Sequence, residues 1–378
     1  MNAIRKNINM PIAEHPHFLR EIVDNMEYMA RVIDENCRII YMNRKMEQVF
    51  GNCVGNVCYN VLGKSERCEH CVSSECKDIG AAVTKEIQLG DKYYKVMSSP
   101  VNLDICNENY SIEIFEDITE KKILENQLMT HYEKMRSDID FAKHIQKRSL
   151  PVDGDYWDTM RIDNIYFPSE DLSGDYYDII KMDENRILLY VADVSGHGIK
   201  SSLITIFLRQ LIRGCIQGRD TNVRDILNHV LESYNALIID EEQFLSILIC
   251  IYDKRTQKLT IANAGHNCLP ILIKKCGEIK EIPVKGMPIC SLINESDHEE
   301  VNVHIETGDR LLLYTDGITE AFNEDTKKLF GVEGIEAVVH KNIDRSGKEL
   351  INKIIGATLD YVNKPPADDI AILCMEML

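Results

Sequence analysis

Short runs of apolar residues separated by polar turns fill the first third of the chain, a pattern typical of strands. Residues 30–34 and 38–42 are two such runs, and the polar pair Glu35 and Asn36 between them predicts a hairpin. Further strands are expected at 92–98 and 110–116, and a helix is expected over 18–29. We therefore expect residues 18–119 to form one small mixed α/β domain.

Residues 120–148 contain neither proline nor glycine, and their apolar residues recur at steps of three or four. This spacing predicts a helix that must bury one stripe, either against a second copy in a parallel coiled coil or on its own domain. We expect 120–150 to be a helical linker that ends at Pro151 and favours a homodimer. The stripe consists of Ile123, Leu124, Leu128, Tyr132, Met135, Ile139, Ala142 and Ile145.

Residues 151–378 show paired strand-like runs interrupted by longer amphipathic segments. Strands are expected at 161–168, 186–194, 244–252, 259–264, 269–273, 310–315 and 369–375, and helices at 198–217, 223–239 and 348–362. Because the strands follow one another like hairpins, the pattern favours antiparallel sheets covered by helices, an α+β sandwich.

Charge and composition exclude several kinds of partner and location. Residues 1–150 carry 20 Lys and Arg against 23 Asp and Glu, whereas 151–378 carry 23 against 38. The acidic second half argues against nucleic acid or an anionic membrane as the main partner. No apolar run is long enough to span a bilayer, and no signal peptide is evident, so we expect a cytoplasmic protein. We therefore do not expect the 13 cysteines to form a disulfide framework.

Four aspartates share one local setting, at or near the end of an apolar strand and mostly beside a small residue. They are Asp175, Asp193, Asp316 and Asp368. An isolated Asp-Gly usually marks only a turn, but four such sites in order indicate more. Carboxylates are the ligands that Mg²⁺ and Mn²⁺ prefer, and four of them can hold two ions about 3.5–4 Å apart. Such a pair activates water for attack on phosphorus.

These aspartates lie in motifs that point to a known family. The motifs are SGDYYD at 173–178, ADVSGHG at 192–198, AGHN at 264–267, YTDG at 314–317 and DDI at 368–370, preceded by HIQKRSLP at 144–151. Over about residues 140–378, the chain resembles the SpoIIE/RsbU-like branch of the PPM serine/threonine phosphatases.

The resemblance implies an αββα sandwich with two Mn²⁺ or Mg²⁺ ions in its cleft. Carried over residue by residue, it makes Asp193 the ligand that bridges both ions and, with Asp175, the centre of catalysis. It assigns Asp316 and Asp368 to one ion or the other and adds the carbonyl of Val194. Asp369 is the second option for the place of Asp368, and Asp178 is expected to support the loop.

Two positions depart from the eukaryotic pattern. A histidine that can protonate the leaving group is replaced by Ser195, and His197 follows two residues later, where a helix cap is the favoured interpretation. Arg161 is the nearest candidate for a phosphate-binding arginine. His266 is expected to be structural.

The first domain resembles a PAS domain, with a strand pair, Met42-Asn43 entering a helix, and Asp117-Ile118-Thr119 before the linker. It also contains a cysteine cluster with one C-x₂-C unit. A Zn²⁺ site, an iron–sulfur cluster, and reduced structural or redox-switching thiols are the alternatives. The ligands would be Cys58, Cys68, Cys71 and Cys76.

The family resemblance implies a metal-dependent protein phosphatase that acts on phosphoserine or phosphothreonine. It further implies that the substrate is a STAS-type anti-anti-sigma factor in a partner-switching circuit, under control of the N-terminal sensor. The alternative is a phosphatase-like module that binds a phosphoprotein without turnover. Retention of all four metal-type aspartates favours the enzyme.

Overall fold

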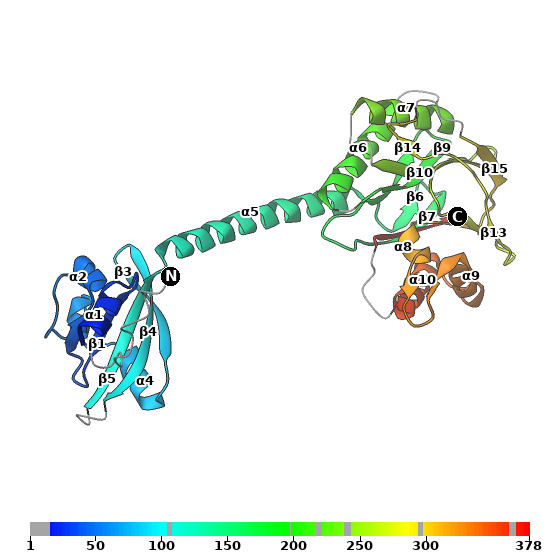
Figure 1. The fold of residues 1–378 in the computed structure, drawn as a ribbon. Coiled ribbons are helices and arrows are strands. Elements are labelled where there is room, and N and C mark those ends of the chain that lie inside the picture. Colours follow the sequence, from blue (N-terminus) through cyan, green and yellow to red (C-terminus); the bar gives the residue numbers. More distant parts are fainter. Residues whose placement is uncertain are drawn as a thin grey trace, which may run out of the picture. The chain divides into compact units, whose positions relative to one another are not determined.

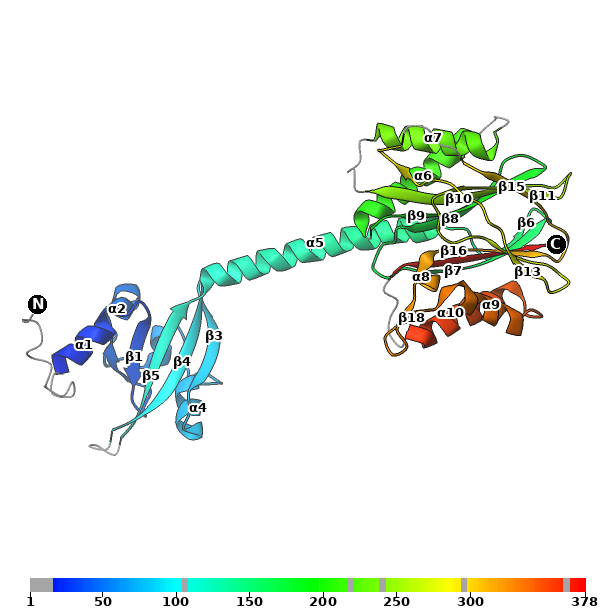
Figure 2. The same cartoon turned by 45° about the vertical axis from the view of Figure 1, so that its right-hand side comes forward.

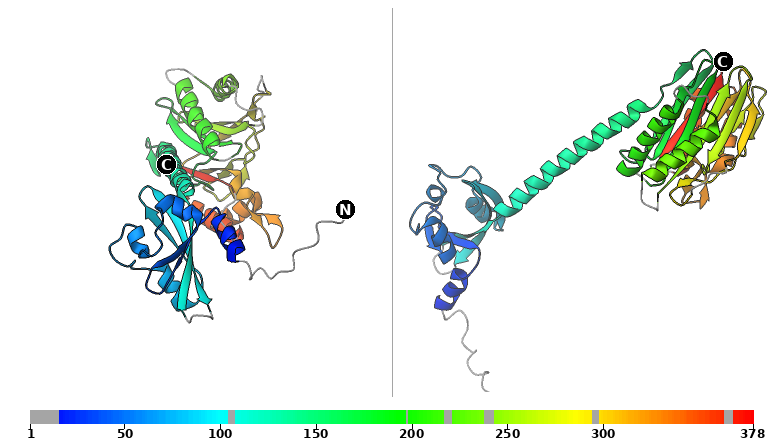
Figure 3. Two further views of the ribbon diagram at one scale, coloured as in Figure 1. Left: turned by 60° about the vertical axis from the view of Figure 1, so that its left-hand side comes forward. Right: turned by 90° about the horizontal axis from the view of Figure 1, so that it is seen from above.

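The computed structural model describes residues 16–103, 108–196, 198–216, 221–237, 243–293, 298–362 and 368–378. It divides into two compact units, residues 1–134 and residues 135–378. Helix α5 (Thr119–Ser149) occupies the stretch expected to be the linker and contributes to both units. The right-hand view of Figure 3 shows it as one uninterrupted helix. Among the described residues, no helix combines the length and the apolar character needed to cross a bilayer.

The first unit is a five-stranded antiparallel sheet in the order β2-β1-β5-β4-β3 (Figure 1). Its strands are β1 (Met29–Ile33), β2 (Ile39–Met42), β3 (Val83–Leu89), β4 (Lys92–Leu103) and β5 (Glu108–Asp117). Its helices are α1 (Pro16–Asp24), α2 (Arg44–Phe50), α3 (Cys58–Val61) and α4 (Val72–Ile79). The predicted hairpin is confirmed as β1–β2, and the helix expected after Met42-Asn43 is α2. Strand β3 and helices α3 and α4 were not predicted.

Asn43 fixes the turn from β2 into α2. Its side-chain oxygen accepts hydrogen bonds from the backbone N–H of Ala30 (2.9 Å) and of Met46 (3.1 Å), so it also caps α2. Its amide nitrogen donates to the carbonyls of Val23 and Tyr28. One fully buried polar side chain therefore joins α1, β1 and α2.

The second unit has four layers, as Figure 2 shows: α6 and α7, two stacked sheets, and then α9 and α10. The first sheet has the order β15-β11-β10-β9-β8, with β14 beside β10, and the second has the order β13-β12-β16-β19-β7-β6. Three apolar clusters fill the interfaces between successive layers. The predicted αββα sandwich is confirmed.

The strands of the second unit are β6 (Gly154–Tyr156), β7 (Met160–Phe167), β8 (Asp175–Lys181), β9 (Arg186–Val194), β10 (Phe244–Asp253), β11 (Lys258–Ala264), β12 (Ile271–Ile273), β13 (Ile279–Glu281), β14 (Ile289–Cys290), β15 (Glu300–His304), β16 (Arg310–Tyr314) and β19 (Ile370–Met377). A small separate hairpin joins β17 (Phe322–Asn323) and β18 (Lys328–Leu329). The helices are α6 (Ile199–Ile216), α7 (Val223–Ala236), α8 (Asp316–Thr319), α9 (Gly331–Lys341) and α10 (Gly347–Val362).

Candidate active site

The predicted aspartates all lie at ends of strands, two in each sheet. Asp175 begins β8, and Asp193 is the last residue but one of β9. Asp316 begins α8 two residues after the end of β16, and Asp368 lies two residues before β19. Asp175 and Asp193 are direct partners across the antiparallel pair β8–β9, so their side chains leave the same face of that sheet.

Thr315 joins the two sheets at this place. Its hydroxyl donates a hydrogen bond to Oδ2 of Asp175 over 2.6 Å, and its backbone N–H donates to the carbonyl of Ala371 over 3.0 Å. Thr315 directly precedes Asp316, and Ala371 follows Asp368 by three residues. The ends of β8, β16 and β19 therefore meet, and the structure brings the four aspartates into one region.

The charges of these carboxylates raise one another's pKa. Burial, then the charge of Asp193, raises the pKa of Asp175 well above its usual range. Burial, then Asp316 and Asp368, raises the pKa of Asp193 to about 7. Burial, then Asp368 and Glu320, raises the pKa of Asp316 to about 6. Within the described ranges no lysine or arginine forms an ion pair with them, so like charges accumulate in a mostly buried place that favours a cation.

The donor set fits a hard divalent cation, because all of its members are oxygens. The carbonyl of Val194 lies close to the loop that leads into Asp175. A Cβ added to Gly174 would lie 2.6 Å from the oxygen of this carbonyl, so the close approach requires glycine at position 174. In the described part of the chain, no three acidic, histidine or cysteine side chains are arranged to coordinate one ion as they stand. The structure thus gathers the predicted ligands without a closed coordination shell.

The two neighbouring aspartates before β19 differ in their surroundings. The buried carboxylate of Asp369 accepts hydrogen bonds from the N–H and hydroxyl of Ser169 (2.7 and 2.8 Å) through Oδ1, and from the N–H of Gly174 (2.9 Å) through Oδ2. Asp368 is exposed, and among the described residues its Oδ1 accepts a hydrogen bond from the N–H of Asp369 (2.8 Å). Both oxygens of Asp369 therefore hold loops, whereas Asp368 keeps acceptor capacity for an ion.

Other residues singled out in the sequence have structural surroundings. Asp178 accepts hydrogen bonds from Nε and Nη2 of Arg213 (2.9 and 3.0 Å), which tie β8 to α6. His266 is buried between Ser246 Oγ (3.2 Å) and the carbonyl of Tyr314 (2.9 Å). Burial lowers the pKa of His266 to about 4, so it is neutral at neutral pH and joins the two sheets, as expected of a structural residue.

The hypothesis that Arg161 grips phosphate is wrong. Arg161 pairs with Glu376 in the β7–β19 register, whereas the aspartates lie at the Phe167–Ile370 end of the same pair. Six residues of strand, about 20 Å, separate the two ends. Its guanidinium binds Asp155 instead (3.0 Å). His197 lies outside the described residues.

Sequence reasoning missed three polar residues that hold the site together: Thr315, Ser169 and Gln146. The amide of Gln146, in α5, donates to the carbonyl of Ser173 (2.8 Å) and accepts the N–H of the same residue (3.3 Å). Gln146 is only 2% exposed, so a helix that is polar overall buries one amide against the loop before Asp175. The sequence held a clue to two of them, because Thr315 and Gln146 lie inside the recognised motifs.

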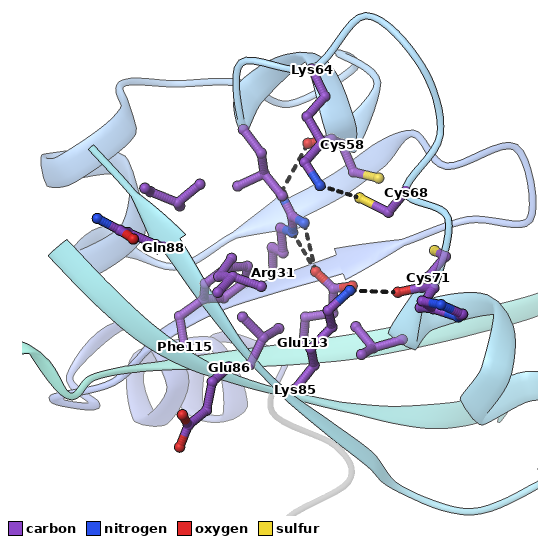
Figure 4. A pocket seen from close by; sticks show the side chains of 16 residues that line it. Arg31, Cys58, Lys64, Cys68, Cys71, Lys85, Glu86, Gln88, Glu113 and Phe115 are labelled. Carbon is purple, nitrogen blue, oxygen red and sulfur yellow. Dashed lines mark hydrogen bonds and ion pairs between the residues drawn. The ribbon is translucent and has the colours of Figure 1, made fainter. Parts of the chain in front are cut away.

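The cysteine cluster of the first unit is only partly assembled. Cys58, Cys68 and Cys71 line one cavity of about 250 Å³, as Figure 4 shows around the buried ion pair of Arg31 and Glu113. The fourth predicted ligand does not line it.

Cys76 is fully buried, and its Sγ lies 3.4 Å from the carbonyl of Ser73 and 3.2 Å from Oγ of Ser98. The predicted four-cysteine set is therefore corrected to three thiols. Cys76 faces the sheet because it lies one turn into α4, whereas Cys71 is the N-cap residue of that helix.

Comparison with known proteins supports two assignments along the chain. The family described as Stage II sporulation protein E (SpoIIE) matches residues 183–378, and the PAS domain matches residues 17–79. Phosphoserine phosphatase RsbU of Bacillus subtilis is 23% identical over 246 residues, which are 64% of this chain and 71% of RsbU. Phosphoserine phosphatase RsbP of the same organism is 29% identical over 190 residues, 49% of this chain and 46% of RsbP.

Two solved structures share the fold of the second unit. The SiaA-PP2C domain of Pseudomonas aeruginosa covers 65% of this chain and 98% of its own, with a TM-score of 0.57 and 20% identity. The RsbU and RsbW domains of Rv1364c from Mycobacterium tuberculosis cover 61% of this chain and 62% of their own, with a TM-score of 0.51 and 20% identity. These likenesses concern the fold alone.

Proposed function

The chain belongs to the SpoIIE family, and from that premise we propose that it is a metal-dependent serine/threonine phosphoprotein phosphatase controlled by its PAS domain. The observation that carries the proposal is the convergence of Asp175, Asp193, Asp316 and Asp368 at the ends of strands from both sheets. A protein that only bound a phosphoprotein would have no need of so many mutually repelling carboxylates.

Each residue has a distinct part in this proposal. Asp193 is opposite Asp175 and is coupled electrostatically to Asp316 and Asp368. It would be the ligand shared by both ions, and Asp175, Asp316 and Asp368 would each hold one of them. The Val194 carbonyl completes the set. Two Mn²⁺ or Mg²⁺ ions bound there would supply an activated water for attack on phosphorus and offset the charge of the phosphoryl oxygens.

The experiment is Mn²⁺-dependent release of phosphate from a phosphoserine peptide by the full-length protein, with Asp193→Asn as the inactive reference. Glu184→Gln is the matched control, since Glu184 is an exposed carboxylate beyond the far end of β8 whose contact is with Lys181. Equal rates for the wild type and Asp193→Asn would contradict the proposal.

For the substrate, we propose a phosphorylated STAS-type anti-anti-sigma factor in the cytoplasm. The support is the similarity to RsbU and RsbP, both named phosphoserine phosphatases. The net acidic surface of the second unit repels nucleic acid and thereby favours a protein substrate. Dephosphorylation of such a partner, compared with a phosphoserine peptide of unrelated sequence, tests the choice.

For assembly, we propose a homodimer through α5. Leu128, Tyr132, Met135, Ile139 and Ala142 recur at alternating steps of four and three, the spacing of a left-handed coiled coil. Leu128, Tyr132 and Met135 are 72%, 50% and 55% exposed in the single chain. A second copy would bury this stripe.

For the first unit, we propose that the cavity thiols bind Zn²⁺ or an iron–sulfur cluster. The observation in favour is that Cys58, Cys68 and Cys71 line one cavity, and three thiolates make a soft ligand set. Zinc, iron and sulfide analysis of anaerobically purified protein tests this, and absence of all three would contradict it.

A further inference from the structure

The hydroxyl of Thr315 has a restricted set of partners. Thr315 is completely buried, and its Oγ1 lies 2.6 Å from Oδ2 of Asp175, 2.9 Å from the backbone nitrogen of Ala371 and 3.4 Å from the carbonyl of Ala371. The N–H of Ala371 can only donate, so the hydroxyl oxygen accepts this bond. Its single proton then goes to the nearer acceptor, the carboxylate of Asp175.

The position of Thr315 is one at which threonine usually caps a helix. It is the N-cap residue of α8, and N-cap threonines usually accept a hydrogen bond from an N–H in the first turn of the helix. Here the side chain makes no capping bond. The hydroxyl is instead turned toward a carboxylate that lies 140 residues earlier in the chain, on the other sheet.

From this geometry we propose that Thr315 is a positioning residue that sets the orientation of the Asp175 carboxylate for metal binding. The inference deepens the proposed function and rests on it. With Oδ2 engaged by the hydroxyl, the rotamer of Asp175 is fixed and Oδ1 is the oxygen left for the cation. Because Thr315 is itself bonded to Ala371 through its N–H and its Oγ1, this orientation follows from the β16–β19 pairing.

In other metal sites, loss of a residue that hydrogen-bonds to a metal ligand typically lowers the metal affinity by about 10–100-fold. Thr315→Val removes the hydroxyl and keeps the shape of the side chain. We expect it to weaken Mn²⁺ binding by about 10-fold or more. Thr315→Ser keeps the hydroxyl and should bind Mn²⁺ within about threefold of the wild type, a smaller change than the loss of a hydrogen bond to a charged group causes.

The measurement is Mn²⁺ binding to the full-length protein, followed by the electron paramagnetic resonance signal of free Mn²⁺, with phosphate release recorded in parallel. Thr358→Val is the matched control: Thr358 is an equally buried threonine in α10 whose hydroxyl donates to the carbonyl of Ile354. It should bind Mn²⁺ like the wild type. Circular dichroism spectra establish that each variant is folded.

The outcomes separate this inference from the proposed function. If the wild type binds no Mn²⁺ at all, the proposed metal site fails, and this inference fails with it. If the wild type binds and folded Thr315→Val binds equally well, only the role of Thr315 is overturned. If Thr315→Val does not fold, the serine variant decides, because loss of Mn²⁺ binding in folded Thr315→Ser would show that the methyl group, not the hydroxyl, is what matters.

Discussion

The carboxylate of Asp369 accepts a hydrogen bond from the backbone N–H of Gly174 over 2.9 Å, although 195 residues separate them in the chain. Gly174 directly precedes Asp175, so the residue that leads into β19 holds the loop that leads into β8. With the Thr315–Asp175 bond, this contact fixes the position of Asp175 from both its backbone and its side chain.

Aspartates 368 and 369 should respond differently to substitution by alanine. Asp369→Ala leaves Ser169 and Gly174 without their acceptor and should lower the free energy of unfolding by about 1–3 kcal/mol. Asp368→Ala should change stability by less than about 0.5 kcal/mol in EDTA, since Asp368 is exposed. It should weaken Mn²⁺ binding by at least about 10-fold. Urea unfolding and Mn²⁺ titration measure both effects, and the reverse pattern would exchange the two roles.

The stability of the metal-free protein should depend on pH. Burial and neighbouring carboxylates raise the pKa of Asp193 to about 7 and that of Asp316 to about 6, from 3.8. The folded state therefore binds protons more readily than the unfolded state, and this stabilisation, complete below about pH 4, is lost as the pH rises through 7.

With EDTA present, the melting temperature of the second unit should thus fall between pH 5 and pH 8. Asp193→Asn, which cannot titrate, should show a shallower fall, and Mn²⁺ at pH 7.5 should raise the melting temperature of the wild type. A melting temperature that rises over this range in the wild type would contradict the electrostatic account.

Gln146 should stabilise the second unit. Gln146→Ala leaves the backbone N–H and C=O of Ser173 unpaired in a buried place, so the free energy of unfolding should fall by about 1–3 kcal/mol. Gln127→Ala, an exposed glutamine in the same helix, is the control and should change it by less than about 0.5 kcal/mol. If both variants lowered the free energy of unfolding equally in urea, the contact with Ser173 would contribute nothing to stability.

The oligomeric state should depend on the apolar stripe of α5. Leu128→Asp combined with Met135→Asp places two charges in the proposed coiled-coil seam and should convert a dimer into a monomer in sedimentation equilibrium. Gln127→Asp, a polar residue next to the stripe, should leave the dimer intact. A wild-type monomer at micromolar concentration would contradict the proposed assembly.

The sequence predicted the strands that carry strong apolar runs, such as β9 and β10, because a buried strand needs such residues over its whole length. It did not predict β8, because the sequence DYYDIIK begins with polar and aromatic residues and was interpreted as part of a motif. The strand is nevertheless almost completely buried. The reason is that Asp175 and Asp178 are buried with partners far away in the chain, Thr315 and Arg213. Such pairings arise from tertiary structure and leave no local periodicity.

The candidate site was likewise predicted only in part. Motifs indicated which aspartates matter, and the structure brings them together from both sheets. The family resemblance favoured Asp368 over Asp369 as a ligand, but it could not predict that Asp369 accepts hydrogen bonds from Ser169 and Gly174, because these partners lie about 200 residues away in the chain. The error over Arg161 has a similar cause: proximity in sequence to the first motif said nothing about which end of β7 the residue occupies.

The most direct test of the central claim is phosphate release from a phosphoserine peptide at millimolar Mn²⁺, wild type against Asp193→Asn, with Glu184→Gln alongside. Asp193 is opposite Asp175 on β9 and electrostatically coupled to Asp316 and Asp368. We predict that Asp193→Asn loses at least about 100-fold in rate, since a lost ligand should cost no less than a lost outer partner, and that Glu184→Gln keeps the wild-type rate. Mn²⁺-independent release, or equal rates for wild type and Asp193→Asn, would contradict the account.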